Sequence, residues 1–168
     1  GLYFTDNKGI AEHYADIGNT VNRAHMKDAG DSRNLYNINL TSSDGHDFDF
    51  LSWYDAVDPE QQHKIKQQAL VENLTDRWGA SVRDVERYPN SIPFSTGESG
   101  ADMYHKLQSE WSMTPKEASM FLSRSGVDGI IYPADSKFNA NNQDLSKAES
   151  VNYVVFDENN IKVQDYVK

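Results

Sequence analysis

The stretch VNYVVFDENNIKV, from Val151 to Val163, carries the strongest structural signal in this chain. Its first half is a dense run of valine and aromatic residues, which favours a buried strand over a helix. The polar cluster 157–160 then predicts a turn, and a second alternating run begins at Ile161. We therefore expect a buried strand, a turn and an edge strand in this region.

The opening residues GLYFTDNKGIAEHYA (1–15) predict a strand followed by a helix. The segment 2–5 has the composition of a short strand. Asp6 or Asn7 can cap a helix over 8–17, whose apolar residues recur at helical spacing. The two ends of the chain thus each contribute a strand.

Between these ends, the sequence predicts strands and helices without an internal repeat or a domain linker. Asp58-Pro59 and Thr114-Pro115 mark two helix starts, the second with a capping box that Glu117 closes. The other expected elements are a strand at 35–40, a strand or extended segment at 48–55, a helix at 101–110, a strand at 127–133 and mostly irregular segments at 77–100 and 137–150. This order predicts an α+β domain with a largely antiparallel sheet.

Composition limits the classes of function. The 168 residues suit a single domain over 1–168, and the chain opens inside a predicted strand, which indicates a truncated N-terminus. Acidic residues outnumber basic ones by 26 to 16, so a formal charge of −10 argues against non-specific binding of nucleic acid. The absence of cysteine excludes disulfides and thiolate metal sites. No apolar run approaches the roughly 20 residues of a membrane helix.

Few residues show a chemical pattern by themselves. The five histidines lack the spacing of a metal site, so we expect no metal. Asp128-Gly129 fits an acid near a cleft, but a tight turn is the favoured interpretation. Tyr3 and Tyr14 would lie on the first strand and the helix after it. Two such rings can sandwich a flat heteroaromatic ring, or they can be ordinary core tyrosines.

Both ends of the chain resemble motifs of the diphtheria-toxin and poly(ADP-ribose) polymerase class of ADP-ribosyltransferases. GLYFTDNKGIAEHYA is similar to the second motif of that class, and VNYVVFDENNIKV to the third. The order of the segments NLYNINL, FLSWYDAVDPEQQHKI, STGESGADMYHKL and TPKEASMFLSRSGVDGIIYP resembles ADP-ribosyltransferase-like domains of phage and mobile-element polyvalent proteins. The resemblance covers nearly the whole chain and implies a split antiparallel sheet with peripheral helices.

The resemblance also implies roles for individual residues. Tyr3 matches the tyrosine of the second motif, Tyr14 matches the ring that stacks on nicotinamide, and Thr5 would line the same pocket of an NAD site. Asn152 stands where the class has its catalytic glutamate. Glu149 lies three residues upstream, about 10 Å away on the opposite face of an extended strand, and could substitute only if the preceding loop curls back.

The resemblance implies a domain that binds NAD as its substrate. The departure at position 152 predicts weak or no transfer activity. A carboxylate at position 152 would bond the ribose hydroxyl and stabilise positive charge as nicotinamide leaves, whereas an amide supplies only a dipole. The class's first motif, a strand with a histidine, is also missing before residue 1. The resemblance implies a protein target and a location in the cytoplasm or delivery with a mobile element. The alternative is a non-catalytic protein-interaction domain of such an element.

Overall fold

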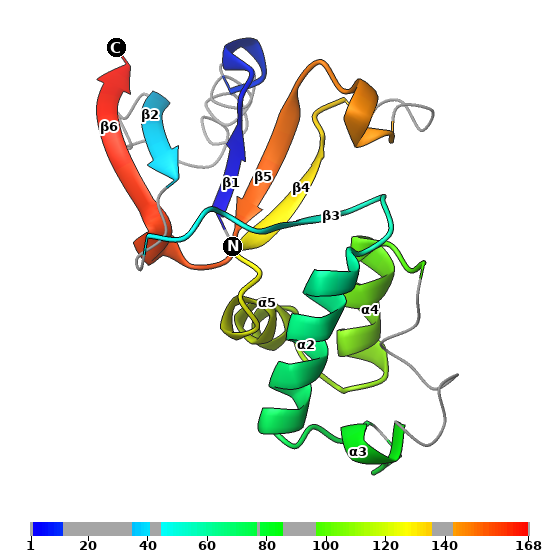
Figure 1. Cartoon of the computed structure of the whole chain (residues 1–168). Coiled ribbons are helices and arrows are strands. Elements are labelled where there is room, and N and C mark those ends of the chain that lie inside the picture. The colour runs from blue at the N-terminus through cyan, green and yellow to red at the C-terminus, as the bar shows by residue number, and fades with distance from the viewer. Residues whose placement is uncertain are drawn as a thin grey trace, which may run out of the picture.

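The computed structural model describes residues 2–11, 35–40, 45–76, 78–85, 97–135 and 143–167. Helices and a mostly antiparallel open sheet make up this part of the chain (Figure 1), which confirms the predicted α+β class. The helices are α2 (Pro59–Val71), α3 (Val82–Val85), α4 (Gly100–Ser109) and α5 (Pro115–Arg124).

The first predicted strand and the strand at the start of the C-terminal stretch lie side by side. The strand order of the larger sheet is β1 (Leu2–Thr5), β5 (Val151–Val155), β4 (Gly129–Pro133) and β3 (Phe50–Ser52). The β1–β5 and β5–β4 pairs are antiparallel, whereas β3 and β4 are parallel. The chain then passes through the predicted turn, a short 3-10 helix over Glu158–Asn160, into the last strand.

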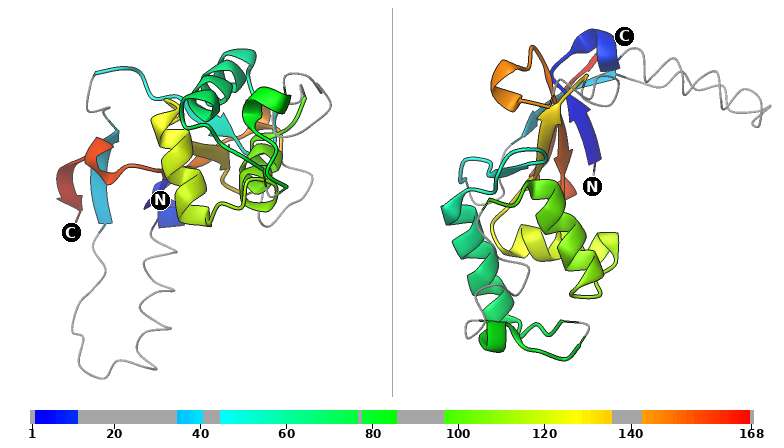
Figure 2. Two further views of the ribbon diagram at one scale, coloured as in Figure 1. Left: turned by 90° about the horizontal axis from the view of Figure 1, so that it is seen from below. Right: turned by 90° about the vertical axis from the view of Figure 1, so that its right-hand side faces the viewer.

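A second sheet consists of β2 (Leu35–Leu40) and β6 (Ile161–Val167), which pair in antiparallel fashion. In Figure 1 and the left view of Figure 2, this pair lies on the β1 side of the larger sheet, away from the helices. The predicted strands at 35–40 and after Ile161 are therefore confirmed.

Local sequence signals explain where the helices start. The Asp58 side chain accepts a hydrogen bond from the backbone N–H of Glu60, and Pro59 follows as the first helical residue of α2. Thr114 and Glu117 form the predicted capping box at the start of α5. Near the N-terminus, Asn7 Oδ1 accepts from the Ile10 N–H at 3.2 Å, and residues 8–11 are helical. The rest of the predicted helix lies outside the described residues.

In three segments the structure narrows or adds to the prediction. Within 48–55 only β3 is a strand, because Ser52 Oγ donates to Asp55 Oδ2 at 2.7 Å and this side-chain pair turns the chain. The segment 77–100, predicted as mostly irregular, contains the short helix α3. The segment 137–150 contains a 3-10 helix over Leu145–Lys147, which starts at a capping aspartate, Asp144.

The expected Asp128-Gly129 turn is wrong. The turn lies earlier, at Gly126, where φ is +84°. Gly129 is the first residue of β4, and Asp128 is a buried residue that is 6% exposed. A Cβ on Gly129 would lie 2.1 Å from the Val154 carbonyl oxygen, so the glycine permits close approach of β5.

The hydrophobic core lies between the helices and the sheet. Its members include fully buried side chains from α2, α4, α5 and β3: Ile65, Met103, Leu107, Phe121, Leu122 and Leu51. Figures 1 and 2 show the helices gathered at the end of the sheet where β5 ends and β1 begins. Among the described residues, none of the helices combines the length and apolar character that crossing a membrane requires.

An ion pair joins two of these helices and gives stability a pH dependence. Arg124 donates from Nε and Nη2 to the two carboxylate oxygens of Glu72, at 2.7 and 3.0 Å, and these bonds lower the Glu72 pKa. Because Arg124 is substantially exposed, we expect Glu72→Gln to reduce the free energy of unfolding by only about 0.5–1 kcal/mol at pH 7. Urea denaturation would measure this.

The sign of the pH effect follows from the direction of the shift. The pKa of Glu72 in the folded chain is below the unfolded value of about 4.3, so the contribution is complete above that pH. It disappears as the pH falls through the folded pKa, and there the variant and the unmodified chain should be equally stable. Glu158→Gln, at an exposed side chain, is the control and should change little at either pH. A Glu72→Gln effect that does not diminish as the pH is lowered below the unfolded pKa would contradict the ion-pair explanation.

Candidate functional site

The pairing of β1 with β5 brings three predicted site residues onto one face of the sheet. Thr5 lies opposite Asn152, and Tyr3 lies opposite Val154. Side chains alternate between faces along a strand, and residues directly opposite each other share a face. Tyr3, Thr5 and Asn152 therefore project from the same side.

Asn152 is buried, at 7% exposed, and lies between β1 and β4. Its partner on β4 is Tyr132, and its side-chain Nδ2 donates a long hydrogen bond of 3.5 Å to the Ala134 carbonyl. The group available here is a neutral amide that is already held by the backbone. It can orient a polar ligand but cannot balance a positive charge.

The hydroxyl of Thr5 makes two hydrogen bonds at the end of β1. Its Oγ1 lies 3.4 Å from the Val151 carbonyl, to which it donates, and it accepts from the Asn7 N–H at 3.2 Å. Asp6 Oδ1 also accepts a hydrogen bond from the Val151 N–H at 2.9 Å. These contacts fasten the first strand to the start of β5. Thr5 therefore lies beside the candidate site, and its hydroxyl stabilises the pairing of β1 with β5.

A pocket of about 260 Å³ opens on this same face, between the sheet and helices α4 and α5. Most of its lining is aromatic and comes from segments far apart in the sequence: Tyr3, Trp53, Tyr54, Tyr104, Tyr132 and Phe156. Ser119, Ile130 and Val154 also line it. Thr5 and Asn152 are not part of this lining, but Asn152 lies two residues before Val154 on the same face.

Two of the rings are held in place by their neighbours. The centroids of Trp53 and Tyr104 are 5.9 Å apart with the rings tilted by 57°. The Tyr104 hydroxyl donates to the Pro115 carbonyl at 2.9 Å, which leaves Ser119 to donate to it at 3.2 Å. By contrast, Tyr3 is 70% exposed at the edge of the sheet. The pocket thus combines fixed inner rings with an accessible outer ring.

The other two predicted site residues are not part of this pocket. Glu149 is exposed in a bend before β5 and is absent from the lining. Tyr14 lies outside the described residues, so the proposed pairing of its ring with Tyr3 stays a prediction.

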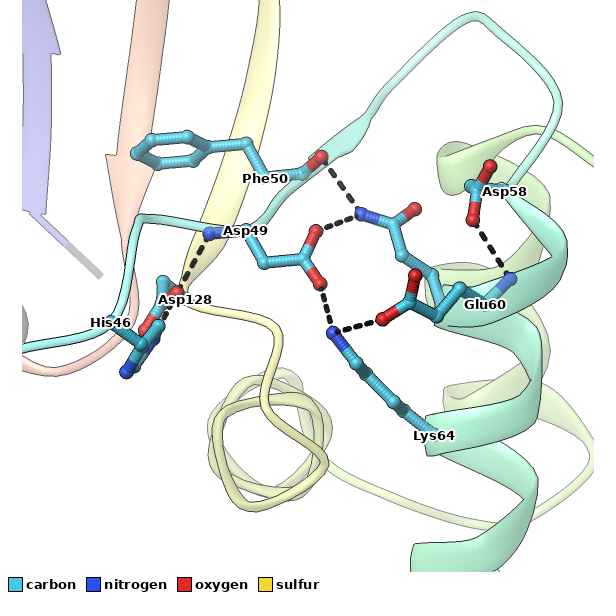
Figure 3. Close-up of polar contacts among 8 residues, drawn as sticks. His46, Asp49, Phe50, Asp58, Glu60, Lys64 and Asp128 are labelled. Atoms are coloured by element: carbon cyan, nitrogen blue, oxygen red, sulfur yellow. Dashed lines mark hydrogen bonds and ion pairs between the residues drawn. The ribbon is translucent and has the colours of Figure 1, made fainter.

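A separate polar network lies where β3 and β4 begin (Figure 3). The buried Asp128 carboxylate accepts from the Asp49 N–H at 2.8 Å, and its Oδ2 lies 2.9 Å from His46 Nε2. Two backbone hydrogen bonds reinforce this contact. The Asp128 N–H donates to the Asp49 carbonyl, and the Phe156 N–H donates to the Asp128 carbonyl. Asp128 thereby ties the segment before β3 to β4 and to the end of β5.

The side chain of Asp49 extends this network to helix α2 (Figure 3). Asp49 accepts hydrogen bonds from Gln61 and from Lys64, the latter at 3.0 Å. The bond to Asp49 raises the pKa of Lys64, which also pairs with Glu60 at 3.3 Å. Each of these groups is engaged in bonds between elements of the fold, so we interpret the network as structural. Among the described residues, no cluster of His, Asp and Glu side chains could hold a metal ion.

The inner rings of the pocket were not recognised as site residues in the sequence. Trp53 lies in the segment 48–55, predicted only as a strand or extended segment, and Tyr104 lies in the predicted helix at 101–110. Their convergence depends on α4 crossing the end of the sheet, and the local sequence carries no signal for that crossing.

Comparison of the chain with protein-family models, with curated proteins and with solved structures finds no match.

Proposed function

We propose that this chain is an ADP-ribosyltransferase-like domain of the diphtheria-toxin and poly(ADP-ribose) polymerase class that binds NAD with weak or no transfer activity. The observation that carries the proposal is the shared face of Tyr3 and Asn152 on two paired strands, next to an aromatic pocket. The strands that carry the two motif resemblances, β1 and β5, pair with each other, and this pairing supports the proposal.

The size and lining of the pocket favour a single ring as the buried part of the ligand. Its volume of about 260 Å³ is below the roughly 300–1,000 Å³ typical of sites for drug-sized ligands. Flat rings gain stacking and edge-on contacts with aromatic side chains. The nicotinamide ring of NAD would enter the pocket, and the remainder of the dinucleotide would extend along the exposed edge at Tyr3.

A low rate of ADP-ribose transfer follows from the neutral side chain at position 152. As nicotinamide leaves the ribose, positive charge develops on the sugar, and a carboxylate stabilises it. Asn152 supplies no charge, and Glu149 projects from an exposed bend outside the pocket. A protein target would be the acceptor in any residual transfer.

Tryptophan fluorescence tests whether NAD enters the pocket. The three tryptophans differ in setting: Trp53 lines the pocket, Trp78 is 76% exposed elsewhere, and Trp111 is buried at 5% exposed. We expect NAD to produce a saturable change in emission excited at 295 nm. The change should persist in Trp78→Phe and disappear in Trp53→Phe, while Trp111 reports an intact fold in both variants.

A different pattern would contradict the proposal. If Trp78→Phe abolished the change and Trp53→Phe preserved it, the ligand would be binding away from the pocket. If neither fluorescence nor calorimetry detected saturable binding of NAD to the unmodified chain, NAD would be ruled out as the ligand.

The second candidate function is a non-catalytic protein-interaction domain of a phage or mobile-element protein. Val71 and Trp78 favour it, because they are 78% and 76% exposed, at the last residue of α2 and in a turn between α2 and α3. Exposed tryptophan is enriched at protein interfaces. This candidate gains weight if the NAD titration fails.

A further inference from the structure

We propose that the aromatic pocket selects a positively charged ring over a neutral ring of the same shape. For a nicotinamide dinucleotide, this means preference for the oxidised form, whose ring is a pyridinium cation, over the reduced form, whose ring is neutral. The inference rests on the proposed function, because it specifies which form of the ligand that site binds.

The composition of the lining is the first argument. In the part of the chain that the structure describes, the lining contains six aromatic residues and no acidic or basic side chain. The faces of such rings are electron-rich and attract cations within about 6 Å of the ring centroid. Trp53 and Tyr104 are held at a fixed tilt, and Tyr3 offers an exposed ring at the entrance.

The charge of the whole molecule is the second argument. The formal charge of −10 produces a negative field that favours a cationic ring over a neutral one, while it opposes equally the diphosphate that NAD and NADH share. A neutral ring gains the same apolar contacts in the pocket but nothing from this field or from the ring faces. The absence of a basic side chain in the lining also means that the diphosphate of a dinucleotide gains nothing inside the pocket.

The size of the expected preference follows from cation–π energetics. Such contacts change affinity by about 2- to 30-fold, from exposed sites to desolvated ones. The pocket opens at an exposed tyrosine and its inner rings, Trp53 and Tyr104, are half-buried, so an intermediate value of about 5- to 10-fold is expected. A preference of this size is measurable by titration.

The experiment uses two matched ligand pairs and isothermal calorimetry on the full chain. The first pair is 1-methylnicotinamide, a cation, and nicotinamide, its neutral counterpart. The second pair is NAD and NADH, which share the same diphosphate and adenosine. All titrations are run at one pH in the same buffer, because the His105 ring lies 5.4 Å from Trp53 and must be in the same state in every comparison.

We expect the cationic member to bind more tightly in each pair for which binding is measurable. Equal affinities, or tighter binding of the neutral members, would overturn the inference while leaving NAD binding intact. If no member of either pair binds, the proposed function fails and the inference fails with it. The two failures are therefore distinguishable.

Substitutions at Tyr3 test whether the ring faces cause the preference. Tyr3→Phe keeps the ring, and Tyr3→Leu replaces it with an aliphatic group at an exposed edge position that does not support the core. We expect Tyr3→Phe to retain the affinity ratio and Tyr3→Leu to reduce it by about 2- to 3-fold. An unchanged ratio in Tyr3→Leu would contradict the proposed origin of the preference.

Discussion

Replacing Asn152 with glutamate is expected to raise the rate of nicotinamide release from NAD by about 100- to 1000-fold over the unmodified chain. The magnitude is that of one oriented electrostatic stabiliser in a partly desolvated site. The measurement is steady-state release of nicotinamide, with the unmodified chain expected near the uncatalysed background.

The position of Asn152 is the reason for this expectation. Its side chain projects from the same face as Tyr3 and Thr5 and stands two residues before Val154, which lines the pocket. A glutamate there is one methylene longer than asparagine and could reach towards a ribose that extends out of the pocket. Its negative charge would stabilise the positive charge that forms on the sugar as the bond to nicotinamide breaks.

The matched control is Asn152→Gln, which has the size of glutamate without its charge. We expect it to show no gain, so a difference between the two variants isolates the carboxylate. Because Asn152 is 7% exposed, thermal unfolding must show that both variants fold before rates are compared. Adding Glu149→Ala to Asn152→Glu should leave the gain unchanged, since Glu149 is exposed outside the pocket.

Two results would contradict this view of position 152. A folded Asn152→Glu variant that binds NAD but releases no more nicotinamide than Asn152→Gln would show that the missing charge is not what limits the chemistry. The unmodified chain could instead release substantial nicotinamide, and Glu149→Ala could abolish that release. Glu149 would then be the catalytic carboxylate.

Local signals were sufficient to predict most elements of the fold. The capping residues Asp58 and Thr114 determine helix starts through hydrogen bonds that span two or three residues, so they are readable from short segments. The strand at 151–155 was predicted for a similar reason, since its valine and aromatic residues suit a sheet.

The site itself depended on contacts that short segments do not encode. The register of β1 with β5 places Tyr3 opposite Val154 and Thr5 opposite Asn152, so Tyr3 and Asn152 share one face of the sheet without being direct partners. Nothing local indicated that Trp53 and Tyr104 would meet, because 51 positions separate them and their contact requires α4 to pack at the end of the sheet. The parallel pairing of β3 with β4 was missed for the same reason.

Substituting Gly129 with alanine is expected to destabilise the chain by about 3 kcal/mol or more. An added Cβ would lie 2.1 Å from the Val154 carbonyl oxygen and 3.0 Å from Cε1 of Phe50. The carbonyl belongs to the central strand β5 and cannot move without disturbing the ladder on both sides. For a chain of this length, the change corresponds to a fall in Tm of about 6–12 °C.

The same substitution separates two explanations of why a glycine stands at position 129. A turn glycine with positive φ is replaced by alanine at a cost of only about 1 kcal/mol when space is free. Gly79, at φ +84° with no atom within 4 Å of an added Cβ, provides that reference within the same chain. If Gly129→Ala cost no more than Gly79→Ala in urea denaturation, close approach of β5 would not be the constraint. A clearly larger loss for Gly129→Ala would show that sheet packing, which no dipeptide pattern encodes, requires the glycine.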